Sequence, residues 1–101
     1  ELPTGSNLAN VIVFNGNTGT MYGDVTLGFD VTFPAGKTLG ITAGQTLTVP
    51  SGKTLTDDGT INNSGAITNE GAINGSGTIN NLDAGSIGGG GTIAGTVTVT
   101  P

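Results

Sequence analysis

The sequence predicts an all-β protein, specifically a β-solenoid of short strands separated by turns rich in glycine and asparagine. Apolar residues recur every six or eight positions, and a glycine precedes nearly every repeat. The chain of 101 residues also contains 20 glycines and many threonines. Glycine costs about 1 kcal/mol relative to alanine in a helix, and β-branched threonine loses rotamer freedom there. We therefore expect almost no helix. A β-sandwich is the alternative, since short strands between turns also fit it.

The repeat consists of a small residue followed by an aliphatic one. It occurs at Thr38-Leu39, Thr46-Leu47, Thr54-Leu55, Thr60-Ile61, Ala66-Ile67, Ala72-Ile73, Thr78-Ile79, Ser86-Ile87 and Thr92-Ile93. Each unit predicts a very short strand with one inward aliphatic residue, followed by a turn in which Gly or Asn adopts positive φ. Units this small cannot fold alone, so we expect them to stack coil upon coil.

The chain is expected to form a single domain, residues 1–101, with three parts. Residues 1–35 are predicted to form N-terminal cap or interface strands, because 10–14 are apolar and 24–33 alternate apolar and polar residues. Residues 36–95 form the repeat array, and 96–101 a C-terminal strand. The predicted strands that could join subunits contain Val11, Val13, Phe14, Val25, Leu27, Phe29, Val31, Phe33, Val97 and Val99. The same strands could instead serve as ordinary cap and core strands of a monomer.

Charge and cysteine content exclude several kinds of partner. The formal net charge is −5, and Lys37 and Lys53 are the only cations. We expect no nucleic-acid binding, because it requires a positive stripe. Membrane insertion is not expected either, since no apolar run approaches the roughly 20 residues of a spanning helix. The absence of cysteine excludes disulfides and thiolate metal sites.

Two stretches carry a family resemblance. Residues 49–56 (VPSGKTLT), followed by 59–65 (GTINNSG), resemble the Gly/Thr/Asn-rich β-helical repeats of prokaryotic surface proteins and filamentous-haemagglutinin-like adhesins. The resemblance extends over about residues 31–95. It implies a β-helical fold and a role at a cell surface. The six-residue spacing is also similar to the hexapeptide repeat of left-handed β-helix acyltransferases, but the eight-residue units depart from it and leave the handedness open.

Chemistry that needs histidine or cysteine is impossible within one chain, because neither residue occurs. The histidine on which hexapeptide acyltransferases rely is therefore missing. Asp57 and Asp58 are adjacent, and neighbours on a strand point to opposite faces, which argues against a glycosidase acid–base pair. They could bind Ca²⁺ with turn carbonyls, although a solvated turn is the simpler interpretation. We predict no catalytic, cofactor-binding or metal-binding residues, and no enzyme activity.

Asparagines fall in or beside the predicted turns, where they tolerate left-handed geometry and can form side-chain ladders between coils. Two of them, Asn62 and Asn74, begin N-x-Ser sequons. If both lie in exposed turns, a glycan could project there without disturbing the core. They are candidate glycosylation sites.

These features predict a secreted, non-enzymatic structural protein that polymerises head to tail by strand pairing at its open ends, or that contacts other cell-surface components. Glu1 in place of a methionine suggests signal-peptide removal, and the low charge agrees with secretion. The alternatives are an adhesin stalk, a glycan-binding module or an ice-binding protein. Ice binding would use Thr46/Thr48 and Thr54/Thr56 in register, whereas Tyr22 is the only Tyr or Trp that could stack on a sugar.

Overall fold

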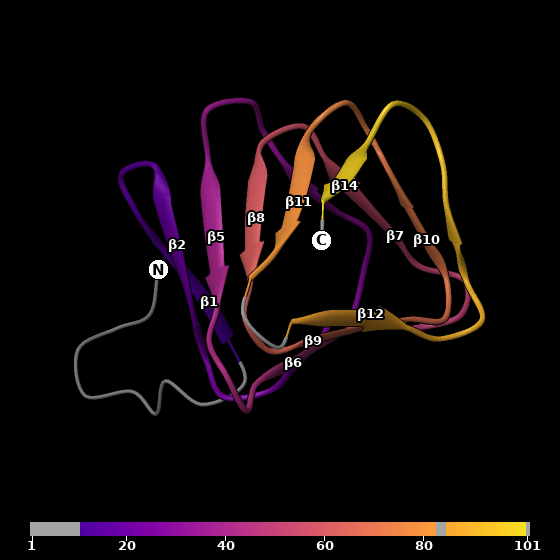
Figure 1. Cartoon of the computed structure of the whole chain (residues 1–101), viewed down its shortest axis with the longest axis horizontal. Helices are drawn as coiled ribbons and strands as arrows, with labels where there is room; N and C mark the ends of the chain where they lie inside the picture. The colour runs from indigo at the N-terminus through magenta and orange to yellow at the C-terminus, as the bar shows by residue number, and fades with distance from the viewer. Residues whose placement is uncertain (1–10, 83–84, 101) are drawn as a thin grey trace.

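The computed structural model describes residues 11–82 and 85–100 and forms a β-solenoid of about four turns (Figure 1). Its strands make three sheets, which are the three walls of a triangular coil. Sheet A contains β1 (Val11–Asn15), β2 (Thr18–Tyr22), β5 (Thr38–Ile41), β8 (Thr60–Asn63), β11 (Thr78–Asn81) and β14 (Thr98–Thr100). Sheet B contains β3 (Val25–Thr26), β6 (Thr46–Val49), β9 (Ala66–Asn69) and β12 (Ser86–Gly88). Sheet C contains β4 (Val31–Phe33), β7 (Thr54–Asp57), β10 (Ala72–Asn74) and β13 (Thr92–Ile93).

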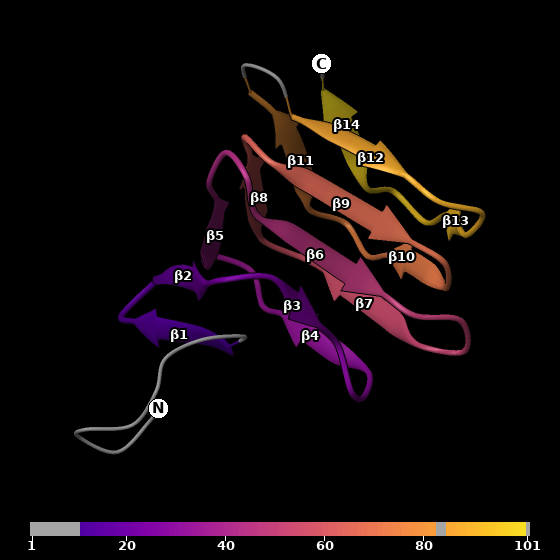
Figure 2. The ribbon, with the colours of Figure 1, turned by 90° about the horizontal axis from the view of Figure 1, so that it is seen from below.

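Successive strands run through sheets A, B and C in turn, so each set of three makes one coil (Figure 2). Neighbouring coils pair in parallel and in register; Thr38 pairs with Thr60, and Thr60 pairs with Thr78. The predicted solenoid is confirmed. The β-sandwich alternative is wrong, because a sandwich consists of antiparallel sheets, whereas every strand pair except β1–β2 is parallel in the described part of the chain.

Aliphatic side chains fill the inside of the coil in three vertical columns. The columns contain Leu39, Ile61 and Ile79 in sheet A, Leu47 and Ile67 in sheet B, and Leu55 and Ile73 in sheet C. All seven are 0–1% exposed. The predicted inward residue is therefore confirmed for these seven repeats, while Ile87 and Ile93 in the last coil continue the columns but are less buried. The strands of four residues also have a second inward position, where Ile41, Val49, Asp57, Asn63 and Asn69 are buried, and the prediction of one inward residue per unit missed it.

The first coil begins earlier than the sequence spacing predicted. Strands β2, β3 and β4 pair in parallel with β5, β6 and β7, so residues 18–33 form a full turn of the solenoid. The alternating stretch at 24–33 is not one strand: Val25 lies in sheet B and Val31 in sheet C. A wall is only a few residues long, so the chain turns a corner between them. Of the strands in residues 11–82 and 85–100, only β1, antiparallel to β2, stands outside the coil pattern.

Candidate functional site

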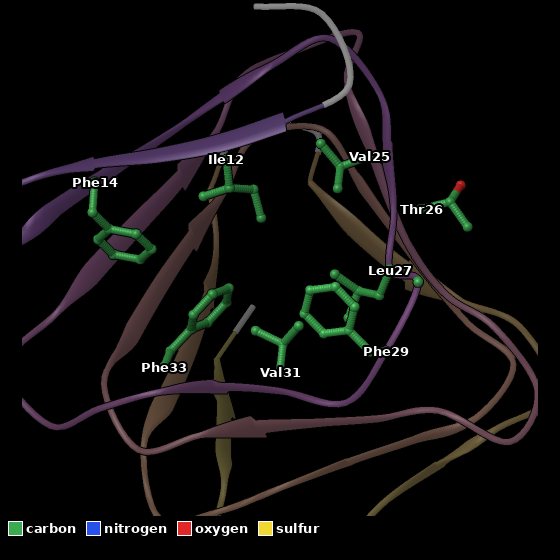
Figure 3. A pocket seen from close by; sticks show the side chains of 9 residues that line it. Ile12, Phe14, Val25, Thr26, Leu27, Phe29, Val31 and Phe33 are labelled. Atoms are coloured by element: carbon green, nitrogen blue, oxygen red, sulfur yellow. The ribbon is translucent and has the colours of Figure 1, made fainter. Parts of the chain in front are cut away.

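The N-terminal end of the solenoid is hollow. The hollow measures about 410 Å³ and lies where a further coil would stack beneath the first one. Its lining residues are Ile12, Phe14, Val25, Thr26, Leu27, Gly28, Phe29, Val31 and Phe33. Figure 3 shows the apolar side chains converging on this space from β1, β3, β4 and the corner between β3 and β4, while Thr26 projects outside the coil. The surface is therefore mostly apolar.

One side of the hollow is the hairpin formed by β1 and β2. Phe14 lies opposite Gly19, where an added Cβ would come within 2.9 Å of the phenyl ring, so the glycine makes room for Phe14. The ring packs against Phe33, with centroids 5.9 Å apart and planes at 57°. Lys37 fixes the hairpin, because its Nζ donates to the carbonyl of Gly16 at 2.8 Å and lies 5.9 Å from the Phe14 ring centroid.

The other two sides are bounded by strand edges. Sheets B and C end at β3 and β4, and no strand in residues 11–82 and 85–100 pairs with their outer edges. Phe29 stands at the corner between these strands and is 72% exposed. A phenyl ring so exposed, beside unpaired strand edges, is a feature that folded proteins usually bury or protect with charge.

The C-terminal end of the solenoid also has strand edges without a strand partner in the described part of the chain, namely those of β12, β13 and β14. Ile93 is 41% exposed and Val99 is 40% exposed, although they lie in line with buried columns of the core. Between Gly85 and Pro101 the sequence contains no Asp, Glu, Lys or Arg. The strands at this end therefore carry no charged side chains of the kind that commonly protect sheet edges, and the one described carboxylate that reaches them is Glu70 at Gly90.

Most of the predicted interface residues meet at these two ends. Six of them line the N-terminal hollow: Phe14, Val25, Leu27, Phe29, Val31 and Phe33. Val99 lies in β14 at the other end, and Val97 precedes it and packs partly against the core. Val11 begins β1, and Val13 does not line the hollow, since it alternates with Ile12 and Phe14 along the strand. Ile12 was missed, although its two-residue spacing from Phe14 placed both on one face.

Both sequon asparagines lie in strands rather than in exposed turns, and both are only half-exposed. The Oδ1 of Asn62 in β8 accepts a hydrogen bond from Nδ2 of Asn80 at 3.0 Å, and the Oδ1 of Asn74 in β10 accepts one from Oγ1 of Thr56 at 3.0 Å. The predicted side-chain ladder between coils is thus present. A glycan on either asparagine would have to leave from the face of a sheet, and glycosylation stays a prediction.

The described carboxylates all bind backbone N–H groups. Oδ1 of Asp24 accepts from the N–H of Thr46, and Oδ1 of Asp30 accepts from that of Thr54, both at 2.9 Å. The remaining three carboxylates, Asp57, Asp58 and Glu70, accept from Gly59, Ser76 and Gly90 at 3.1, 3.1 and 3.4 Å. These groups link one coil to the next or close a corner. Among the described residues, no three Asp or Glu side chains cluster as a metal site.

Asp57 is the exception in its burial. Its side chain is 0% exposed, and in the described residues its Oδ2 has no hydrogen-bond partner. Burial raises the pKa of Asp57 to about 6; the hydrogen bond from Gly59 partly opposes the rise, and the negative charge of Asp58 adds to it. Asp58 points the other way and binds Ser76. As predicted, the two carboxylates lie on opposite faces, so they do not form a pair.

The threonine pairs proposed for ice binding do not share a face. Thr46 and Thr48 lie in sheet B, whereas Thr54 and Thr56 lie in sheet C. The prediction that they are in register is wrong, because neighbours in register are about one coil apart in sequence rather than one repeat. A different column exists on the outside of sheet A. It contains Thr18, Thr38, Thr60, Thr78 and Thr98, one from each of five consecutive strands.

No protein-family model, curated protein or solved structure matches this chain. Within the described residues, no helix has the length and hydropathy needed to cross a membrane.

Proposed function

We propose that this protein is a non-enzymatic, extracellular structural subunit that assembles end to end into a filament or surface layer. The observation that carries the proposal is the pair of open ends. Among the described residues, the N-terminal end has an apolar hollow beside strand edges that have no strand partner, and the C-terminal end has exposed Ile93 and Val99 in edge strands without charged side chains. Strand addition at such edges supplies main-chain hydrogen bonds, and apolar pockets add selectivity.

The sides of the solenoid support a structural role. The described carboxylates are engaged by backbone N–H groups, which leaves them to hold coils together rather than to act on a substrate. The core columns run through the molecule without interruption. A contact between unlike ends need not close into a ring, so it produces a filament. The composition rich in Gly, Thr and Asn, and the resemblance to β-helical surface repeats, support an extracellular location.

An adhesin stalk is the nearest alternative. In a stalk, the same edges would stack against further coils of the same polypeptide instead of a second copy. The internal geometry would be identical, since coil stacks on coil in both cases.

Electron microscopy of the 101-residue chain over a concentration series tests the proposal. We expect regular filaments of uniform width, whose length grows with concentration. Analytical ultracentrifugation at the same concentrations gives the mass distribution. A single monomeric species across the whole series would contradict self-assembly and favour the stalk.

The threonine column of sheet A favours a second candidate function, the binding of a repetitive surface such as ice or an ordered glycan. Parallel strands place successive threonines about 4.8 Å apart, and this regular array presents methyl and hydroxyl groups on one face. Ice recrystallisation assays test this function. Replacing Thr60 at the centre of the column with Tyr should remove activity, while replacing Thr48 on sheet B with Tyr should not.

A further inference from the structure

We propose that the hollow at the N-terminal end takes the C-terminal strand β14 of a second copy, so that chains join head to tail. The inference rests on the proposed function and names the surfaces and the polarity of the joint. The occupant is the segment 96–100, with Val99 as the side chain that enters the hollow.

The two ends have complementary steps. At the N-terminal end, β1 extends sheet A one strand below the first coil, whereas sheets B and C end at β3 and β4. At the C-terminal end, β14 extends sheet A one strand beyond β12 and β13. At each end, sheet A thus projects one strand beyond sheets B and C. We call this projecting strand, β1 or β14, the ridge of that end.

The steps determine how two copies can meet. If two copies stacked with their A sheets aligned, β14 of one copy would meet β1 of the next, and the hollow would stay empty. Because the coil has three walls, a rotation of about one third of a turn places β14 beside the edge of β3 or β4 instead. The ridge of one copy then enters the hollow of the next.

The inner face of β14 and the lining of the hollow are chemically alike, since both present apolar side chains. Val99 is inward-facing, in line with Ile79 below it, yet it is 40% exposed because no coil in the described part of the chain covers it. Val25 and Val31 head the equivalent inward columns of sheets B and C and line the hollow. Placing Val99 against them continues the stacking already present between coils. The edge N–H and C=O groups of both strands gain partners at the same time.

The distribution of charge favours the C-terminal end as the one that enters the hollow of another copy. The chain carries a net charge of −5, so copies repel one another at a distance. Residues 85–101 contain no charged side chain, and the Glu70 carboxylate that reaches this end binds Gly90, between β12 and β13 rather than in β14. The segment 96–100 can therefore approach the hollow of another copy without bringing a charged side chain into it.

Cysteine cross-linking tests the joint, and the chain contains no native cysteine to interfere. Val99→Cys and Val31→Cys are prepared separately, mixed, and oxidised under assembly conditions. A disulfide needs Cα atoms about 4.4–6.8 Å apart, a range met by adjacent strands. We expect disulfide-linked dimers in the mixture and none from either variant alone. The control uses Thr48→Cys, on the outer face of sheet B, in place of Val31→Cys. This variant should give no dimer with Val99→Cys.

The possible results distinguish a failure of the head-to-tail joint from a failure of the proposed function. Filaments without a cross-link from Val99→Cys to Val31→Cys or to Val25→Cys would overturn the joint and leave the proposed function standing. Dimers of Val99→Cys alone, or of Val31→Cys alone, would mean that like ends meet, which contradicts the head-to-tail polarity. A small apolar molecule retained in the hollow by native mass spectrometry, with no assembly, would refute the second copy as occupant. Monomers at every concentration would refute both proposals.

A charge variant gives an independent measurement. Val99→Asp should raise the concentration needed for half-assembly by at least about tenfold, because it places a carboxylate in the apolar hollow. The matched control is Thr98→Asp, which adds the same charge one residue away on the outer face of β14. Equal effects of the two variants would show that general repulsion, rather than entry of Val99, controls assembly.

Discussion

The two middle coils close the same triangle by different means. Coil 2, residues 38–59, places four-residue turns at two of its corners, and coil 3, residues 60–77, has none. In coil 2 the turn from Pro50 to Lys53 has a hydrogen bond from the N–H of Lys53 to the carbonyl of Pro50 at 3.0 Å, with Gly52 at φ 84°. Positive φ at this third position is the requirement of a type II turn. The turn projects outward, so the inside of the corner is left to Val49.

Coil 3 turns its corners with side chains instead. Asn69 is 2% exposed, and its Oδ1 accepts from the N–H of Gly71 at 3.2 Å while its Nδ2 donates to the carbonyl of Thr92 in the next coil at 2.8 Å. Asn63 makes the equivalent bonds to Gly65 and Ser86. A short corner therefore depends on a buried amide and a nearby glycine, whereas a long corner depends on the backbone turn.

The largest effect is expected from Gly71→Ala in coil 3. A Cβ at this corner would lie 2.2 Å from the carbonyl oxygen of Lys53, so backbone rather than a flexible side chain would have to move. We expect a loss of about 4 kcal/mol or more in the free energy of unfolding, measured by urea denaturation. Gly40→Ala is the control, because nothing lies within 4 Å of its added Cβ. If both variants had the stability of the parent, the coils would not be in contact at this corner.

Asn69→Leu tests the buried amide with a side chain of similar size. The substitution removes the partners of the Gly71 N–H and the Thr92 carbonyl, and buried groups without partners are costly. We expect a loss of roughly 2–3 kcal/mol, again by urea denaturation. Val49→Ala is the comparison variant. Val49 occupies the position of Asn69 at a corner of coil 2, and its truncation removes only apolar contacts. An Asn69→Leu protein as stable as the parent would mean that the corner does not need the amide.

Asp57→Asn should stabilise the protein, because Asp57 occupies the corner position that Asn63 and Asn69 fill in coil 3. Its Oδ1 already accepts from Gly59, but its Oδ2 has no partner in the described residues. An amide there would place Nδ2 toward the next coil. The carbonyl of Thr78 is the acceptor expected there, since Thr78 stands at the position that Ser86 and Thr92 occupy relative to Asn63 and Asn69. We expect a gain of about 2 kcal/mol at pH 7 in the free energy of unfolding.

The same substitution has a pH signature. The pKa of Asp57 rises from 3.8 to about 6 on folding, so the folded state binds the proton more tightly than the unfolded state. The stabilising effect of protonation is complete below about pH 4 and is lost as the pH rises through 6. Thermal melts from pH 4 to 7 should therefore show stability falling in the parent protein more than in Asp57→Asn. Parallel pH profiles would contradict this assignment.

The sequence favoured the solenoid, because the aliphatic period and the glycines are local signals, but the parallel pairing of the strands was needed to exclude a β-sandwich. It was not sufficient to predict which repeats share a wall. Thr46 and Thr54 look like neighbours in sequence but lie in different sheets, and the column partner of Thr46 is Ala66. The N-terminal hollow itself was not predicted, but most of its lining residues lie in the segment that the apolar alternation of residues 24–33 marked as cap or interface strands. Its shape depends on a corner at Phe29 that interrupts the alternation. Gly28 and Asp30 flank this corner and are residues that favour turns, but the alternation of apolar residues masked that signal.

The smallest effect is expected from Gly52→Ala in coil 2, and it separates the two uses of glycine most sharply. Nothing lies within 4 Å of a Cβ at Gly52, so the only cost is the positive φ of 84°. An L-residue in this conformation costs about 1 kcal/mol. Asparagine tolerates positive φ better than alanine, so Gly52→Asn should recover part of the loss. At Gly71 the cost comes from the Lys53 carbonyl, and Gly71→Asn should be no better than Gly71→Ala. Denaturation of the four variants side by side checks this; rescue by asparagine at both positions would mean that both coils use glycine only for its backbone freedom.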